Sequence, residues 1–132
     1  MDMKDYAQKA EELKQSGGYN CCQAVTAALA DQTELPPEIL YQTAAGFCIG
    51  MGNLNATCGA LIGAGMIAGL VTEGKGTVRA AKQISETFSQ LCGGAITCRE
   101  LKGIDSGKVL CPCNECVKNA VLAYGKVLEL KK

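Results

Sequence analysis

The stretch TCGALIGAGMIAGL, residues 57–70, sets the expectation for the fold because it combines an apolar helical length with four glycines. Each interior glycine costs a helix about 1 kcal/mol relative to alanine. The glycines at 59 and 63 share one side of a helix with alanines 60 and 64, and the glycines at 65 and 69 repeat the spacing on an overlapping face. Small residues at this spacing let a neighbouring backbone approach closely. The stretch therefore predicts a tightly packed central helix over residues 57–72.

Helical periodicity also extends outward from this segment. Further helices are expected over residues 2–15, 20–31, 36–47, 77–91 and 114–130, with Thr77 as a cap. Residues 95–113 read as irregular, with a short helix around 99–102, and turn-forming residues predict a loop near 50–55. Strand signals are weak. We expect one all-α domain over residues 1–132, a compact bundle of five to six helices around the glycine-rich one.

Composition narrows the classes of function. The 132 residues include 13 basic and 13 acidic side chains, so zero net charge gives no reason to expect nucleic acid as a partner. The longest apolar stretch is about twelve residues, against about twenty for a membrane span, and no secretory signal is visible. A cytoplasmic location without membrane insertion is expected. The glycine-rich helix allows a homodimer but does not require one.

Nine cysteines stand beside zero histidines. In a reducing cytoplasm, clustered cysteines are typical of metal binding or thiol redox chemistry rather than of structural disulfides. The missing histidine excludes Cys–His catalytic pairs and mixed Cys/His zinc sites. Any site must therefore work with thiols, carboxylates, hydroxyls and backbone groups.

Cys58 lies where the glycine-rich helix is expected to begin, behind a turn containing Asn53 and Asn55. Free backbone N–H groups and the helix dipole favour a thiolate at such a position. We expect Cys58 to be the most reactive thiol, with Arg99 and Lys102 as candidate cations. The same argument applies to Cys21 and Cys22, at another expected helix start. Ordinary packing is the preferred interpretation for three other cysteines, namely Cys22, Cys48 and Cys92.

A further thiol-rich segment is CPCNEC, with Cys111, Cys113 and Cys116, and Cys98 precedes it by a short loop. Its spacing suits a metal, an iron–sulfur cluster or a dithiol that opens and closes. It is incomplete as a zinc-finger signature and as a ferredoxin signature.

The chain resembles the redox-active C-GCAxxG-C-C family over nearly its whole length. CGALIG, residues 58–63, is similar to the motif that names the family, and YNCCQAV, CRELKG and CNECVKNAV resemble its other elements. The resemblance points to Cys58, Cys21, Cys98 and Cys113 as the functional cysteines, with Cys116 as an alternative to the last. It implies redox activity, and it establishes no substrate. Five additional cysteines depart from the family pattern.

Three functions are therefore open. The leading hypothesis is a thiol-redox protein, as a thiol oxidoreductase or an electron carrier with an unidentified redox partner, in which Cys58 attacks and Cys21, Cys98 or Cys113 resolves. The alternative is an iron–sulfur cluster or soft metal held by Cys21, Cys58, Cys98 and Cys113, with Cys111 or Cys116 as substitutes. The third is a structural protein whose cysteines only pack.

Overall fold

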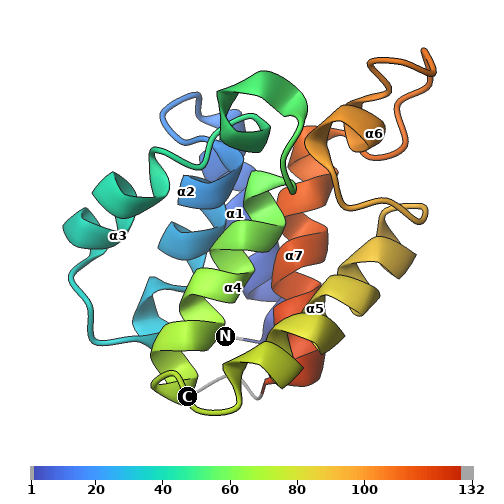
Figure 1. The fold of residues 1–132 in the computed structure, drawn as a ribbon. Coiled ribbons are helices and arrows are strands. Elements are labelled where there is room, and N and C mark those ends of the chain that lie inside the picture. The colour runs from blue at the N-terminus through green and yellow to red at the C-terminus, as the bar shows by residue number, and fades with distance from the viewer. Residues whose placement is uncertain (1, 129–132) are drawn as a thin grey trace.

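The computed structural model describes residues 2–128, and this part of the chain is helical with no strand (Figure 1). One isolated antiparallel β-bridge joins Thr57 to Thr97. The predicted all-α class is confirmed. The seven α-helices of the described residues are α1 (Met3–Gln15), α2 (Cys21–Ala28), α3 (Pro37–Ala44), α4 (Gly59–Thr72), α5 (Thr77–Leu91), α6 (Cys98–Lys102) and α7 (Cys113–Val127). A 3₁₀ turn, η1 (Ala30–Gln32), follows α2, and an irregular turn, η2 (Gly50–Leu54), with left-handed Met51 and Gly52 inside it, precedes α4.

The short helix expected around 99–102 is present as α6, and with it the predicted number of five to six helices is too low. The Thr97 side chain accepts a hydrogen bond from the Glu100 N–H at its start, and left-handed Gly103 ends it. The helix expected over 20–31 ends at residue 28, where the chain tightens into η1. The helix expected over 36–47 ends at residue 44. The predicted end of the last helix, residue 130, lies outside the described residues.

The predicted cap of α5 is wrong. Gly76, in the left-handed region with φ 71°, is the N-cap, and no side chain caps this helix start. Thr77 is instead the first helical residue, and its hydroxyl lies 2.6 Å from that of Thr72 at the end of α4. This hydrogen bond ties the two helices together across their short connection.

The close approach predicted for α4 occurs on the side that faces α2. A Cβ built on Gly59 would lie 2.6 Å from the Phe47 carbonyl oxygen, and one on Gly63 would lie 3.0 Å from the Cys22 carbonyl oxygen. At Gly59 that oxygen belongs to the segment after α3 and leaves no room for a Cβ, whereas at Gly63 the α2 backbone is so near that a side chain must displace its neighbours. The same prediction is wrong for Gly65, which has nothing within 4 Å, and for Gly69, whose nearest neighbour would be at 3.9 Å. Both are half-buried, and no backbone packs against them.

The helices share a hydrophobic core. Helix α4 packs against α2, α5 and α7, while α7 packs against α1, α2, α4 and α5. That α4 is the central helix stays a prediction. Within residues 2–128, no helix combines the length and apolarity that crossing a membrane requires.

The direction of the helices determines where the cysteines meet. In Figure 1 the N-terminal ends of α2, α4 and α7 lie at the same end of the bundle, and α6 lies beside them. Each of these starts carries a cysteine: Cys21 is the first residue of α2, Cys58 is the N-cap of α4, and Cys98 and Cys113 are the first residues of α6 and α7.

Candidate functional site: a pocket of thiols

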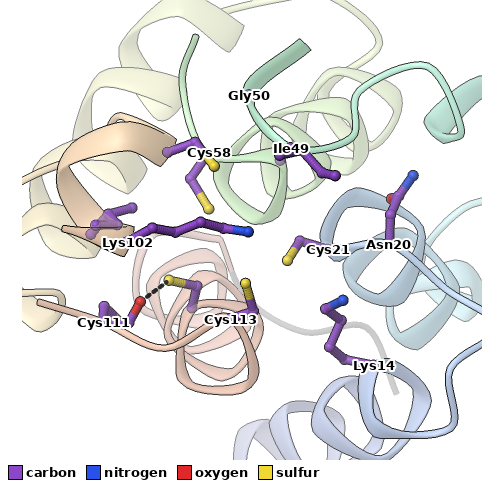
Figure 2. A pocket seen from close by; sticks show the side chains of 13 residues that line it. Lys14, Asn20, Cys21, Ile49, Gly50, Cys58, Lys102, Cys111 and Cys113 are labelled. Carbon is purple, nitrogen blue, oxygen red and sulfur yellow. Dashed lines mark hydrogen bonds between the residues drawn. The ribbon is translucent and has the colours of Figure 1, made fainter. Parts of the chain in front are cut away.

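A pocket at this end of the bundle is lined by six of the nine cysteines (Figure 2). All four cysteines that the sequence singled out line it, so the fold brings them together. Two lysines line it as well, and no carboxylate does among the described residues. The six cysteines are Cys21, Cys58, Cys98, Cys111, Cys113 and Cys116, and the lysines are Lys14 and Lys102.

Backbone pairing fixes two of these cysteines in place. The Cys58 N–H donates to the Ile96 carbonyl at 2.7 Å, and the Cys98 N–H donates to the Ala56 carbonyl at 3.1 Å. These bonds flank the β-bridge, so the segment before α4 runs antiparallel to the segment before α6. Two cysteines that are forty positions apart in sequence are thereby held at one wall of the pocket.

Cys21 and Cys113 form a thiol–thiolate pair across the pocket. A hydrogen bond from the Cys21 thiol lowers the pKa of Cys113 to about 5, against the opposing effect of burial, and the charges of Lys102 and Lys14 lower it further. Donating that hydrogen bond, together with burial, raises the pKa of Cys21. Both side chains are half-buried. At neutral pH, Cys113 is therefore the thiolate of the pair and Cys21 its proton donor.

Cys58 and Cys116 form a second pair of the same kind. A hydrogen bond from the Cys116 thiol lowers the pKa of Cys58, burial opposes it, and the first-turn amides of Ala60 and Leu61 lower it further. The hydrogen bond to Cys58 is in turn the main cause that raises the pKa of Cys116. The helix start thus favours a Cys58 thiolate as the sequence indicates, but Cys58 is only 5% exposed.

Only one of the two cations proposed from the sequence reaches the thiols. In Figure 2 the side chain of Lys102 extends into the space that Cys21, Cys58 and Cys113 face. Burial would lower the pKa of Lys102, but the negative charge of the Cys113 thiolate and a hydrogen bond to it outweigh burial and raise that pKa. Arg99 instead donates to Asn55 at 2.9 Å and pairs with Asp105 at 3.4 Å. The sequence did not identify Lys14.

The packing interpretation fits Cys22, whose pKa burial raises to about 12 and whose thiol donates to the Met66 sulfur at 3.6 Å. Cys48 does not line the pocket. Burial also raises the pKa of Cys98. Cys98 is therefore a neutral thiol at the edge of the site.

Cys92, for which the sequence favoured packing, belongs to a cluster of thiols that could bind metal. Its sulfur and those of Cys111 and Cys116 all lie within 4.8 Å of one another. Hydrogen bonding with Cys116, whose single proton Cys58 and the Cys111 carbonyl also compete for, lowers the pKa of Cys92 to about 6 against burial, and Asn119 lowers it further. No signal in the sequence separates Cys92 from a packing cysteine, because its partners lie about twenty residues away and meet it only in the fold.

The four cysteines singled out from the sequence do not form such a close group. All nine cysteines are described, all are free thiols, and no other three of them have sulfurs within 4.8 Å of one another. A metal or cluster on Cys21, Cys58, Cys98 and Cys113 stays a prediction.

The pocket encloses about 50 Å³. A cavity needs about 10–15 Å³ to hold one water molecule, and pockets for organic ligands typically have about 300 Å³ or more. The pocket therefore suits a few waters or a group inserted from outside.

The fold and the pocket define a small all-helical protein with paired thiols at converging helix starts. Residues 19–127 match the family described as "Putative redox-active protein (C_GCAxxG_C_C)", and the chain belongs to this family. No curated protein and no solved structure matches the chain.

Proposed function

We propose that the protein is a thiol–disulfide redox protein in which Cys113 is the attacking thiolate and Cys21 its disulfide partner. The observation that carries the proposal is the pair itself: a thiolate beside a thiol that donates a hydrogen bond to it, with Lys102 and Lys14 stabilising the charge. A low-pKa, accessible thiolate with an adjacent resolving thiol is typical of redox cysteines.

The chemical steps balance without an additional reactant when the substrate is a disulfide. The Cys113 thiolate attacks one sulfur of the substrate, forms a mixed disulfide and releases the other half as a thiolate. That leaving thiolate takes the proton of Cys21, whose sulfur then attacks Cys113 and expels the second half of the substrate. Two electrons pass to the substrate, and Cys21 and Cys113 become a disulfide. An external dithiol reverses both steps.

In this proposal Cys58 reacts after Cys113, although the sequence analysis expects Cys58 to be the most reactive thiol. Its side chain is 5% exposed, whereas Cys113 is half-buried at the pocket wall. The charge of Cys113 acts on Cys58, so the two thiolates lie within electrostatic reach of each other. The Cys58–Cys116 pair can accept the disulfide from Cys21–Cys113 by internal exchange, since the same thiolate chemistry applies.

The test is oxidation of the reduced protein by glutathione disulfide, followed by alkylation of the remaining thiols and peptide mass spectrometry. We expect the first disulfide to join Cys21 and Cys113. In Cys21→Ser a glutathione adduct on Cys113 is expected to accumulate, because the thiol that is hydrogen-bonded to Cys113 and resolves the adduct in the wild type is missing. Cys48→Ser is the matched control, since that thiol is also half-buried but lies outside the pocket. A first adduct on Cys58, or equal reactivity of Cys48 and Cys113, would contradict the proposal.

A further inference from the structure

A second group of thiols lies beside the pocket and is more deeply buried. Cys92 is the C-cap of α5, Cys111 precedes α7 and Cys116 lies in its first turn. They are 1%, 4% and 2% exposed, and their sulfurs are mutually within 4.8 Å. Thiols from the end of α5, the segment before α7 and the first turn of α7 therefore meet at one point.

One polar side chain directs a hydrogen-bond donor at two sulfurs of this triad. The Asn119 side-chain N–H₂ lies 3.3 Å from the Cys92 sulfur and 3.6 Å from the Cys111 sulfur. It also donates to the Leu91 carbonyl at 3.3 Å, which fixes the orientation of the amide, because only the N–H₂ group can donate there. Donors held toward ligand sulfurs by a second interaction are typical of the outer shell of a metal site.

The number and type of ligands select the ion. Thiolates favour soft metals such as Cu(I), zinc and iron–sulfur clusters over magnesium or calcium. Structural zinc almost always takes four ligands, and among the described residues no fourth cysteine, aspartate or glutamate joins the group at this spacing. With metal–sulfur bonds of about 2.3 Å, a planar three-coordinate ion needs sulfurs about 4 Å apart. The observed spacing reaches this with small side-chain movements.

An ion can also reach the triad. Cys111 and Cys116 line the pocket as well, so they connect the buried group to the pocket, while Cys92 lies outside it. We propose that Cys92, Cys111 and Cys116 form a buried three-thiolate site for one Cu(I) ion, entered through the pocket. Each thiol that binds the ion releases its proton to solvent, and no electron is transferred.

The experiment is titration of reduced, oxygen-free protein with Cu(I) in competition with bathocuproine disulfonate. We expect one Cu(I) per chain to resist the chelator, with three sulfur neighbours by X-ray absorption spectroscopy. Asn119→Leu removes the outer-shell donor and is expected to weaken binding about 10–100-fold. Cys92→Ala is expected to weaken it more than Asn119→Leu does, and Cys48→Ala should leave it unchanged.

The pocket thiols provide the decisive contrast. Cys21→Ala/Cys113→Ala should retain the ion, and Cys92→Ala should still form the Cys21–Cys113 disulfide with glutathione disulfide, so the two proposals can fail separately. Full Cu(I) binding by Cys92→Ala, loss of binding in the pocket double variant, or two or four sulfurs in the wild-type spectrum would overturn the site. The spectrum of the wild-type protein decides the matter even where a variant does not fold.

Discussion

The two thiol groups are built from the same residue type and differ in what surrounds them. The Cys21–Cys113 pair is half-buried and lies near two lysines, so its negative charge is balanced by cations at the pocket. The triad of Cys92, Cys111 and Cys116 is buried and faces an amide rather than a cation. The contrast teaches that exposure and the source of the stabilising charge, rather than the cysteine itself, separate a thiol suited to exchange from one suited to holding an ion.

The largest expected effect comes from removing the exchange thiolate. Cys113→Ser should slow the reaction with glutathione disulfide by about 100-fold or more, because the thiolate is the nucleophile and a hydroxyl cannot replace it. Stopped-flow or quenched kinetics on reduced protein measures the rate. Cys92→Ser, which changes the triad instead, should stay within about threefold of wild type. Equal losses in the two variants would remove the distinction between the groups.

The packing of α2 against α4 supports the pocket rather than the triad, because Cys21 begins α2 and Cys58 is the N-cap of α4. Gly63→Leu should lower the free energy of unfolding by about 1–3 kcal/mol, because the new side chain meets the Cys22 carbonyl and Val25. Denaturant unfolding measures this. Gly65→Ala is the matched control, with open space at the site and an expected gain of up to about 1 kcal/mol from helix propensity. A neutral Gly63→Leu would mean that α2 does not pack as described.

A smaller effect is expected from the pocket cation. Lys102→Met should raise the pKa of Cys113 and slow its alkylation several-fold near pH 5, where the thiolate fraction is sensitive, while leaving the rate above pH 8 nearly unchanged. Lys102→Arg should restore the wild-type profile. Arg99→Met is the control, because Arg99 is paired with Asp105 on the surface. A matching shift in Arg99→Met would indicate a general charge effect rather than a local one.

The helices and four of the pocket cysteines could be predicted from the sequence, because both follow from local patterns. Apolar periodicity marks a helix, and a cysteine behind a turn marks a helix start, as at Cys21 and Cys58. Local pattern did not reveal which thiol carries the charge. The low pKa of Cys113 depends on Cys21 and Lys14, about a hundred positions away, and Cys92 meets its partners only when α5 packs on α7. Arg99 and Lys102 are alike in sequence, and only the fold turns one of them into the pocket.

The central claim is that Cys113 is a thiolate at neutral pH, and the pH dependence of its alkylation tests this most directly. Reduced protein is labelled briefly with iodoacetamide from pH 4 to 10, and each cysteine is quantified by mass spectrometry. A lowered pKa means that the thiolate persists as the pH falls until it is protonated near the folded-state value. Labelling of Cys113 should therefore be nearly constant above about pH 6 and lose half its rate near pH 5. A midpoint near 8.5, the value of an ordinary cysteine, would contradict the account.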